Sequence, residues 1–553
     1  MSILASRTQS PVAQLAEHLT VNQRVPGSSP GGGAFLFPII EVMADVELNI
    51  TKQPSELKDV ASREVRDVIS PQDGKVIGQQ ILHTASDVKA AFQRARIAQR
   101  TWAKTSFKQR RRILLRFHNL VIDARDELMD LIQAENGKNR LSALEEILDV
   151  ALTARYYAYQ GPHALRDRRR RGPLPVLTSV TEQRPPKGVV GVIAPFNYPL
   201  ALAVSDALAA IMAGNAVVVK PDTQTPLSAE LARQLLAKAG LPSDVFVVVT
   251  GRGGEVGQAI VEECDYLMFT GSTATGEKLA KQAAARLIDY SMELGGKNAM
   301  IIAPDADLAR AVEGAWNACY GNSGQLCISI ERMYVHQAVA AKFIPAFVHR
   351  VEAMRVGPGR DWEIDMGSQI SVEHTDLIEK FVDDAVAKGA TVLAGGKRLR
   401  ELGDAFYAPT VLSNVPADAD LYRDEVFGPV VYLEIVDSIE EAIAKANDSS
   451  YGLNSSVWAA PRTGREIARQ LQTGTVNINE GYAPAWSALD APMGGWKKSG
   501  TGRRHGEHGI TKYTEPRNVT QTRWMNIMAN QWPREQYANV LAQALKLGRD
   551  LLR

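Results

Sequence analysis

The sequence predicts an α/β protein built around a doubly wound parallel sheet, and three observations support this prediction. Short runs such as 215–221, "NAVVVKP", and 266–272, "YLMFTGS", are nearly continuous in apolar residues, which is typical of strands covered on both faces. Helical patterns at 226–240 and 275–287 alternate with these runs. A chain of 553 residues is also long enough for three to four domain-sized units.

The first part of the chain differs from the rest. The run "RVPGSSPGGG" at 24–33 is a Pro/Gly/Ser cluster without apolar periodicity. The segment 12–33 is either a genuine mobile tail or the translation of an upstream transfer-RNA gene, with Met43 as the true start, and both interpretations stay open. We predict a disordered extension over 1–43. No long apolar core precedes the cluster, so no signal peptide is predicted.

Two amphipathic helical patterns follow, at 86–104 and 108–138, and a third occupies the end of the chain at 535–552. The only long charge-free stretch begins at Gly188, and prolines and Asn197 interrupt it, so no membrane span is predicted.

Composition excludes several classes of function. The formal net charge is +1, which gives no reason to expect nucleic acid or an anionic membrane as a partner. The arginine-rich run 166–171 is interpreted as a solvated connector. Three cysteines without paired spacing predict neither a disulfide framework nor a metal site, and they favour the reducing cytoplasm.

Two glycine-rich loops resemble nucleotide fingerprints without matching them. The loop 251–257, "GRGGEVG", lacks the spacing of a dinucleotide motif, and Glu277 stands where a phosphate loop requires lysine. Gly271 and Ser272 nevertheless lie between a predicted strand and a helix N-terminus, where phosphate is favoured.

Several short motifs occur in the order typical of one family. They are "PFNYP" from Pro195, "VVVKP" ending at Pro221, "FTGSTATG" from Phe269, "MELGGKN" from Met292, "GQLC" from Gly324, "EVFGPV" from Glu425 and "GGWKKSGTGRRHG" near the C-terminus. Together they resemble the aldehyde dehydrogenase superfamily, over about Glu56 to Arg523. Within that superfamily the chain is most similar to bacterial succinate-semialdehyde dehydrogenases.

Three residues in these motifs have the chemistry that aldehyde oxidation needs. A thiolate that adds to a carbonyl gives an oxyanion able to expel hydride, so Cys327, between a polar loop and an apolar run, is the candidate nucleophile. Glu293, before two glycines, can take a proton from water or from the thiol. The amide of Asn197 can donate to the oxyanion, together with the backbone N–H of Cys327. Cys264 and Cys319 are interpreted as structural.

The resemblance also implies which residues hold a nicotinamide cofactor. The family lysine that corresponds to Lys220 holds the adenosine ribose, and the glutamate that corresponds to Glu425 holds the nicotinamide ribose. Phe427 is expected to pack near the nicotinamide. Gly271 and Ser272 would face the phosphates.

The choice of cofactor is predicted from Thr223. NAD-preferring relatives commonly carry glutamate there, which would repel the 2′-phosphate of NADP. Threonine removes that repulsion, and Lys220 can supply positive charge. Asp222 would restore the repulsion if its side chain turned inward. We predict NADP, with NAD as the alternative.

The substrate is harder to derive from the sequence. Tyr198, Trp486 and Met493 are candidates for an aldehyde channel, or for plain core positions. Relatives that oxidise succinate semialdehyde often bind its carboxylate with arginines where this chain has Gly321 and Ser205. The prediction is succinate semialdehyde with NADP. The alternative is a broad range of aliphatic or aromatic aldehydes.

Two other classes of protein fit the sequence less well. A cysteine hydrolase would need a histidine partner for Cys327, but His336 is embedded in a strand-like run. It would also leave Asn197 and Lys220 unexplained. A catalytically idle binding or structural protein of the same fold would tend to lose Cys327 or Glu293, which are both present.

The resemblance implies a three-part architecture. A cofactor-binding domain is expected over 44–165 and 185–295, and a catalytic α/β domain over 296–503. A small β flap over 166–184 and 504–525 would join subunits into a homodimer or homotetramer. The segment 526–553 is expected to be a C-terminal extension.

Overall fold

The computed structural model describes residues 64–172, 178–523 and 533–549. The predicted disordered extension over 1–43 lies outside these residues, and so does part of the predicted C-terminal extension. Within the described ranges, no helix is both long and apolar enough to cross a membrane.

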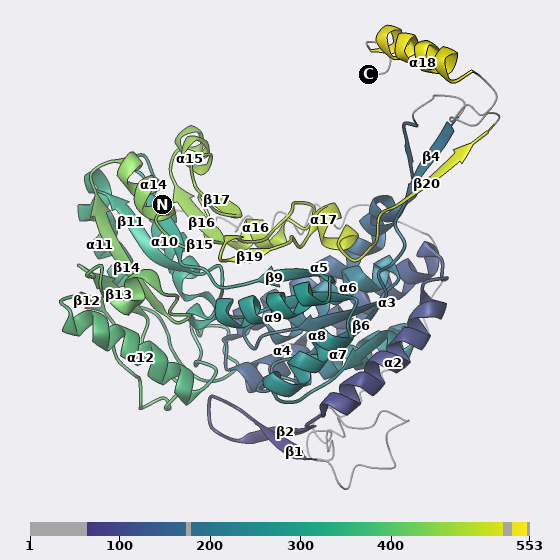
Figure 1. Cartoon of the computed structure of the whole chain (residues 1–553). Coiled ribbons are helices and arrows are strands. Elements are labelled where there is room, and N and C mark those ends of the chain that lie inside the picture. Colours follow the sequence, from purple (N-terminus) through teal and green to yellow (C-terminus); the bar gives the residue numbers. More distant parts are fainter. Residues whose placement is uncertain (1–63, 173–177, 524–532, 550–553) are drawn as a thin grey trace, which may run out of the picture. The chain divides into compact units, whose positions relative to one another are not determined.

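The first sheet is doubly wound, and the predicted α/β class is confirmed (Figure 1). Its six strands run in the order β19-β9-β8-β5-β6-β7, and all but β19 are parallel to their neighbours. Their bounds are β5 (Val189–Ile193), β6 (Ala216–Lys220), β7 (Phe246–Val248), β8 (Tyr266–Thr270), β9 (Asp289–Glu293) and β19 (Gly500–Thr501). Both β6 and β8 are buried along their whole length, which is why their sequences are nearly continuous apolar runs.

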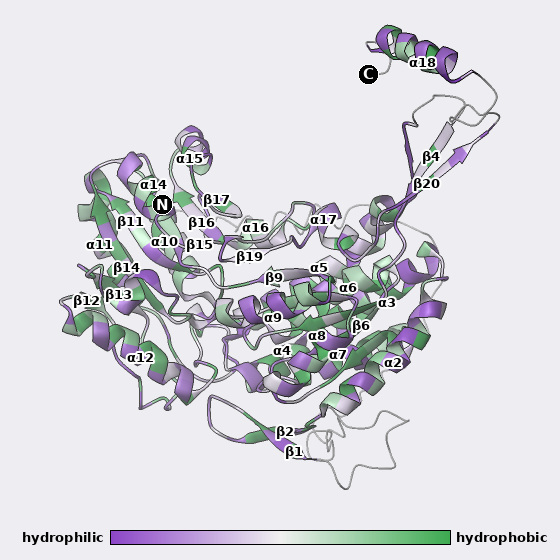
Figure 2. Ribbon diagram, in the orientation of Figure 1, coloured by the Kyte–Doolittle hydropathy of each residue, from purple (hydrophilic) through white to green (hydrophobic). Residues whose placement is uncertain are grey.

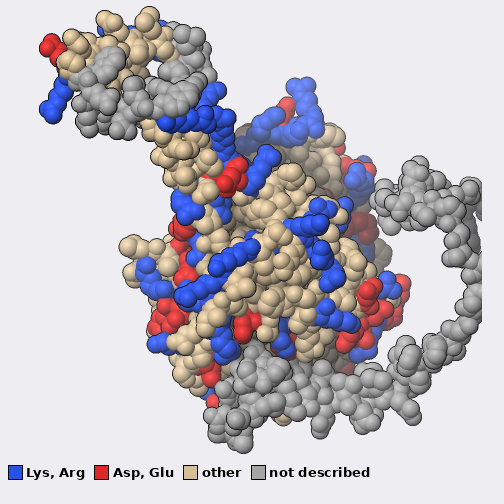
Figure 3. All heavy atoms as spheres, turned by 90° about the vertical axis from the view of Figure 1, so that its right-hand side faces the viewer, with Lys and Arg blue, Asp and Glu red and all other residues tan. Residues whose placement is uncertain are grey.

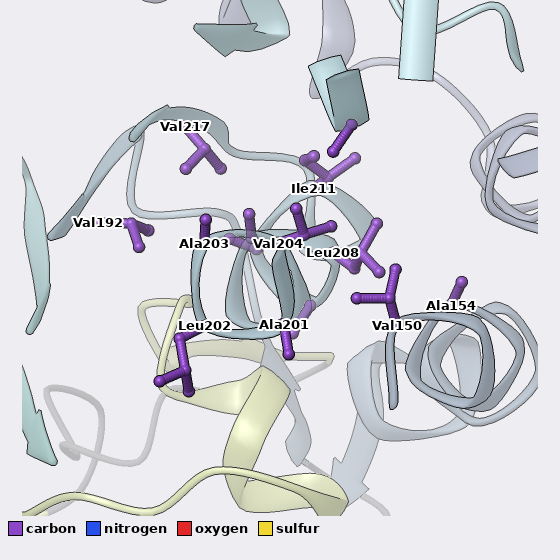
Figure 4. Packing of buried hydrophobic residues seen from close by; sticks show 14 of the residues in the cluster. Val150, Ala154, Val192, Ala201, Leu202, Ala203, Val204, Leu208, Ile211 and Val217 are labelled. Carbon is purple, nitrogen blue, oxygen red and sulfur yellow. The ribbon is translucent and has the colours of Figure 1, made fainter. Parts of the chain in front are cut away.

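Helices cover both faces of this sheet. They are α2 (Ala85–Trp102), α3 (Phe107–Asp123), α4 (Arg125–Asn136), α5 (Arg140–Leu165), α6 (Pro199–Ala213), α7 (Leu227–Ala239), α8 (Gln258–Glu263) and α9 (Thr273–Ala285). Successive residues of β6 belong to opposite core clusters, Val217 to the one around α6 and Val218 to the one around α2 and α8. Figure 4 shows the first cluster, in which Val217 packs near α6 and Val150 approaches from α5. Hydrophobic residues run along β6 in Figure 2.

A second sheet follows in the sequence. Its seven strands run in the order β12-β13-β14-β11-β10-β16-β17, and only the β12–β13 pair is antiparallel. Their bounds are β10 (Asn298–Ile302), β11 (Ile330–His336), β12 (Thr391–Ala394), β13 (Thr410–Ser413), β14 (Val430–Val436), β16 (Asn454–Trp458) and β17 (Thr475–Ile478). The helices of this region are α10 (Leu308–Tyr320), α11 (Gln337–Glu352), α12 (Val372–Ala387), α13 (Asp420–Arg423), α14 (Ile439–Asn447), α15 (Pro461–Ala468) and α16 (Ala483–Ser487).

The ranges predicted for the flap contain a three-stranded antiparallel sheet. It consists of β3 (Arg168–Arg170), β4 (Thr178–Gln183) and β20 (Arg517–Thr522). The arginine-rich run is therefore partly a strand rather than only a connector, and neighbouring acids pair with it, as Glu182 does with Arg170. The helix α17 (Gly506–Thr511) lies within the range predicted for the flap but packs on α5 and α6. Similarly, β19 joins the first sheet although it lies in the range predicted for the catalytic domain.

The remaining elements are small or peripheral. Two two-stranded sheets are formed by β1 (Val65–Ile69) with β2 (Val76–Ile81), and by β15 (Tyr451–Gly452) with β18 (Trp496–Lys497). The C-terminal helix α18 (Arg534–Gly548) matches the predicted amphipathic segment, and none of its described residues is buried. On the face drawn in Figure 3, acidic and basic side chains are interspersed with uncharged surface.

Candidate active site

The carboxyl ends of four neighbouring strands in the first sheet bring five predicted residues to one edge. Asn197 follows β5, Lys220 ends β6, Gly271 and Ser272 follow β8, and Glu293 ends β9. In open α/β sheets this edge is where ligands bind. The order of the strands, β9-β8-β5-β6, explains how residues almost one hundred positions apart come to one place.

The second sheet supplies residues from the opposite direction. Cys327 lies three residues before the first residue of β11, and the turn 425–428 precedes β14, so both lie near the amino ends of strands. A cavity of about 640 Å³ is lined by residues of the first sheet and its loops, and by residues of loops and a helix next to the second sheet. The predicted residues that line it are Asn197, Lys220, Gly271, Ser272, Glu293, Cys327, Glu425 and Phe427.

The loop before Cys327 is fixed by its backbone geometry. Asn322 and Ser323 have positive φ angles of 53° and 58°, and Gly324 has one of 73°. A Cβ atom at Gly324 would lie 2.1 Å from the carbonyl oxygen of Gly428, so only glycine fits there. The Asn322 side chain donates to the backbone carbonyl of Asn197 at 3.0 Å. This short polar loop therefore carries the thiol into position beside the candidate oxyanion donor.

Asn197 is held through both its side chain and its backbone. Its Nδ2 donates to the carbonyl oxygen of Gln325 at 2.9 Å, two residues before Cys327. An amide nitrogen carries two hydrogens, so one remains for a ligand in the cavity. Its backbone carbonyl accepts from Lys138 at 2.6 Å. Asn197 is 2% exposed, so these contacts leave it little freedom to move.

Glu293 is a buried carboxylate with an unusual pKa. Burial raises the pKa of this carboxyl to about 7, although the charges of Arg504 and Lys512 lower it. Among the described residues, its Oε1 atom has no hydrogen-bond partner. A carboxyl group with a pKa near neutrality and an unoccupied oxygen can take up and release a proton at physiological pH.

The two glycines after Glu293 make room for other groups of the site. A Cβ atom at Gly295 would lie 2.1 Å from Oε2 of Glu425, and one at Gly296 would lie 2.7 Å from the carbonyl oxygen of Cys327. The backbone N–H of Gly296 donates to Oε1 of Glu425 at 2.8 Å. The glycine pair thus packs Cys327 and Glu425 against the end of β9.

Cys327 differs from the other cysteines in its surroundings. Burial and the charge of Glu425 raise the pKa of its thiol to about 12. The thiol is therefore protonated at neutral pH and needs a base to become a nucleophile. Cys327 is half-buried and lines the cavity, whereas Cys264 and Cys319 are buried in apolar clusters.

One part of the cavity fits a dinucleotide. Ser272 is the N-cap of α9, so the helix N-terminus faces this space with its backbone amides, and phosphate is favoured there. A Cβ atom added at Gly253 or Gly254 would meet no other atom within 4 Å, so the backbone there is open to a ligand. Lys278 and Gln282 of α9 also line this part. Among the described residues, Oε1 of Gln282 is buried without a hydrogen-bond partner.

Thr223 does not line this cavity, contrary to the expected role. Its hydroxyl donates to the carbonyl oxygen of Gly251 at 3.1 Å, because the chain after β6 turns towards that loop. Asp222 lines the cavity instead, and its Oδ1 accepts from the backbone of Gln224 at 2.9 Å. Lys220 lines the cavity with its ammonium 3.0 Å from the carbonyl oxygen of Pro221.

The turn that carries Glu425 and Phe427 has a strained backbone, and hydrogen bonds hold it in place. Phe427 has a φ of 56°, which is unfavourable for a bulky residue. Its backbone N–H donates to Glu331 at 2.9 Å, and its carbonyl oxygen lies 2.8 Å from Nε2 of His374. Burial raises the pKa of the Glu425 carboxyl to about 8. His374 also lines the cavity, which no sequence motif indicated.

A second cavity, of about 180 Å³, meets the first at Cys327 and Asn197. Tyr198 and Trp486, two of the three candidates for an aldehyde channel, line it. Met493 lines neither cavity in the described structure and belongs to the main core. The other lining residues are Glu145, Leu148, Asp149, Leu152, Leu202, Leu326, Ile328, Tyr482, Ala483, Ser487 and Leu489.

This second cavity is mainly apolar. No lysine or arginine lines it in the described part of the chain. Its two carboxyl groups are engaged by hydroxyls: Glu145 accepts from Tyr198 at 2.9 Å, and Asp149 accepts from Ser205 at 2.5 Å. A small apolar molecule that enters here would reach Cys327 from a cavity other than the one lined by the N-terminus of α9.

Comparisons with known proteins agree with this geometry. The model of the Aldehyde dehydrogenase family matches residues 58–519. A Mycolicibacterium smegmatis protein named "Putative succinate-semialdehyde dehydrogenase (NADP+)" is 52% identical over 85% of this chain and 91% of its own length. The crystal structure of an NADP-dependent enzyme from E. coli is 33% identical, with a TM-score of 0.80, over 83% of this chain and 95% of that one. An NAD+ complex of an aldehyde dehydrogenase from Bacillus cereus is 34% identical, with a TM-score of 0.78, over 83% and 93%.

Proposed function

The chain belongs to the aldehyde dehydrogenase family, and we propose that it oxidises an aldehyde to a carboxylic acid through a thioester on Cys327. One observation carries this proposal. Cys327 and Asn197 line both cavities, so a thiol and an amide donor stand where a cofactor-sized space meets a substrate-sized one. Glu293, with its pKa of about 7, lines the larger of the two cavities.

The first half of the reaction forms the thioester. Glu293 takes the thiol proton, and the sulfur of Cys327 bonds to the aldehyde carbon while the carbonyl electron pair moves to oxygen. The amide of Asn197 and the backbone N–H of Cys327 stabilise this oxyanion. When bound, the oxidised nicotinamide supplies the acceptor for the hydride that leaves the carbon. The carbonyl then re-forms as a thioester.

The second half releases the acid. Glu293 first releases the thiol proton to solvent. It then removes a proton from water, and the water oxygen bonds to the thioester carbon. The same two donors hold the new oxyanion, and its collapse breaks the carbon–sulfur bond. The thiolate of Cys327 leaves and recovers a proton. A base whose pKa lies near 7 can serve both halves because it gains and loses its proton easily.

We propose NADP as the cofactor. The name of the 52% identical relative includes NADP, while the solved relatives include both an NADP-dependent enzyme and an NAD+ complex. The N-terminus of α9 and Lys220 offer positive potential to phosphates. Residue 223 is a threonine and carries no carboxylate, but Asp222 lines the cavity. The preference for NADP over NAD therefore depends on where the Asp222 side chain lies.

Succinate semialdehyde is the substrate that we propose, on the basis of the name of that relative. A broad-range activity towards apolar aldehydes is the second candidate. The mainly apolar lining of the smaller cavity, without lysine or arginine in the described structure, favours this second candidate. Because the two substrates differ at the end distant from the aldehyde, the surroundings of that end decide between them.

A direct assay tests the proposed function. The purified protein is incubated with succinate semialdehyde, hexanal or benzaldehyde, and with NADP or NAD, while the absorbance of the reduced nicotinamide is followed. We expect reduction of NADP with succinate semialdehyde. If none of the three aldehydes leads to reduction of either cofactor, the proposal is wrong.

We further propose a cytoplasmic homo-oligomer. The three cysteines are free thiols, which suits a reducing compartment. The sheet of β20, β4 and β3 has two edge strands, and a second copy could cover one of them. Light scattering on the purified protein would distinguish a monomer from a dimer or tetramer.

A further inference from the structure

The turn 425–428 lies between the segment that carries the base and the loop that carries the thiol. A Cβ atom at Gly295 would lie 2.1 Å from Oε2 of Glu425, and one at Gly324 would lie 2.1 Å from the carbonyl oxygen of Gly428. The turn thus contacts the chain on both sides of the reacting groups. The end of the larger cavity that it lines is therefore the end where a cofactor has to react.

The backbone of this turn needs outside contacts to keep its conformation. Phe427 has a φ of 56°, which is costly for a bulky residue and persists only where the surroundings enforce it. On one side, the carbonyl oxygen of Phe427 lies 2.8 Å from Nε2 of His374. A carbonyl oxygen only accepts, so this nitrogen carries the proton. On the other side, the backbone N–H groups of the turn point towards the second sheet, where a carboxylate receives them.

That carboxylate is Glu331, which is 3% exposed. It lies in β11, which pairs with β14, the strand that follows the turn. Its Oε1 accepts from the backbone N–H of Phe427 at 2.9 Å, and its Oε2 accepts from that of Val426 at 3.0 Å. Oε2 also accepts from Nζ of Lys297 at 2.7 Å. One side chain therefore supplies acceptors to two consecutive backbone donors of the turn.

A charged group at this buried position suits these donors. An ionised carboxylate is costly to bury unless donors and a counter-charge surround it, and here two N–H groups and the ammonium of Lys297 do so. Hydrogen bonds to an ionised acceptor are also stronger than those between neutral groups. Without the carboxylate, the two N–H groups would lose these acceptors inside the protein, and the turn would have to move to find others.

The ring of Phe427 carries the effect of the turn across the cavity. Its centroid lies 5.9 Å from that of Phe196, with the rings edge to face. Phe196 comes directly before Asn197, and all three residues line the larger cavity. A shift of the turn therefore moves the Phe427 ring relative to Phe196 and changes the shape of the cavity at this end.

We propose that Glu331 is a positioning residue for the cofactor, and that it holds the turn 425–428 so that Glu425 and Phe427 line the end of the cavity next to Cys327. This role rests on the proposed function, because it assumes a nicotinamide cofactor in the larger cavity. Glu331 does not line that cavity in the described structure, so it acts through the turn.

The test compares the binding of a whole cofactor with the binding of half of it. NADP contains a nicotinamide half and an adenosine half, whereas adenosine 2′,5′-bisphosphate contains the adenosine half alone. The Kd of each ligand is measured by calorimetric titration, well below the Tm, for the wild type and for Glu331→Gln. Glutamine has one acceptor oxygen, and its amide group would face a backbone N–H or the ammonium of Lys297. We expect a Kd for NADP that is raised by about 10- to 100-fold, the range for hydrogen bonds to a charged group, and a Kd for the bisphosphate within about 2-fold of the wild type.

Lys297→Met is the matched control, because it breaks the same buried ion pair but leaves the Glu331 carboxylate with both backbone donors. Each variant leaves one charge buried without its counter-charge, so both should lower the Tm. Only Glu331→Gln should weaken the binding of NADP. In steady-state kinetics the KM for NADP should rise in Glu331→Gln more than the KM for the aldehyde.

Three results would overturn the positioning role of Glu331. They are an unchanged Kd for NADP in Glu331→Gln, an equal rise for NADP and the bisphosphate, and a loss of NADP affinity in Lys297→Met as large as in Glu331→Gln. If Glu331→Gln does not fold, Glu331→Asp, which keeps the charge on a shorter side chain, is measured with the same expected pattern. If the wild type binds NAD better, NAD and ADP take the places of the two ligands. A wild type that binds neither NADP nor NAD would overturn the proposed function itself.

Discussion

The ammonium nitrogen of Lys138 lies 2.6 Å from the backbone carbonyl oxygen of Asn197 and 2.7 Å from a carboxylate oxygen of Glu146. The Lys138 and Glu146 side chains are completely buried. The other oxygen of Glu146 accepts from the backbone of Leu200 and Ala201, in the first turn of α6. A buried ion pair therefore fixes the turn that presents Asn197 to the cavity.

Removing one partner of this pair should destabilise the protein and misplace Asn197. Lys138→Met leaves Glu146 buried without its counter-charge, which costs about 3–5 kcal/mol of the free energy of unfolding. We expect a lower Tm and a lower kcat. Lys388→Met is the control, because Lys388 pairs with Asp384 at the surface. Equal melting temperatures for the two variants would contradict this role.

Asn197→Ala tests the oxyanion donor. The variant should lose on the order of 10²-fold in kcat, because one of two donors to the developing charge is gone. Its Kd for NADP, measured by fluorescence titration, should stay close to the wild-type value. A kcat near that of the wild type would remove Asn197 from this role.

The pH dependence of the rate should report Glu293. Burial raises the pKa of this carboxyl to about 7, so lowering the pH below 7 protonates the base and slows the reaction. We expect kcat to rise with pH through about 7 and then level off. Glu293→Gln cannot ionise, so its low residual rate should lack this rise. The same pH profile in the variant and the wild type would assign the titration to another group.

The cofactor preference should respond to charge at Thr223. Thr223→Glu places a carboxylate next to Asp222 and should shift the ratio of kcat/KM towards NAD by about 10-fold or more, through repulsion of the 2′-phosphate. Thr223→Gln is the control, since it has the same size without the charge. Similar ratios for both variants would show that Asp222, rather than residue 223, controls the preference.

The parallel sheet and the meeting of its strand ends could be predicted from the sequence. The apolar runs at 215–221 and 266–272 became β6 and β8 because strands covered on both faces need no polar alternation. Motif order then indicated that Asn197, Glu293 and Cys327 belong together, and all three line one cavity.

Contacts between distant segments could not be predicted in this way. His374 lies in the first turn of α12, and nothing local indicates that it faces Phe427. Thr223 was expected to face the cofactor, but the chain turns it towards Gly251. Arg504 looked like one of several basic residues near the C-terminus, and only the fold shows it buried beside Asp206. Such pairings depend on how elements pack, and a single sequence does not record packing.

The thioester on Cys327 is the central claim, and trapping it tests that claim most directly. Glu293→Gln protein is mixed with NADP and excess succinate semialdehyde at about pH 9, where a small fraction of the Cys327 thiol ionises without Glu293 and forms the thioester slowly. Intact mass and peptide masses are measured after one turnover. The account predicts one equivalent of NADPH and one acyl group per chain, on the peptide that contains Cys327, and neither product in Cys327→Ala. An acyl group on Cys264 or Cys319, or substantial turnover by Cys327→Ala, would contradict it.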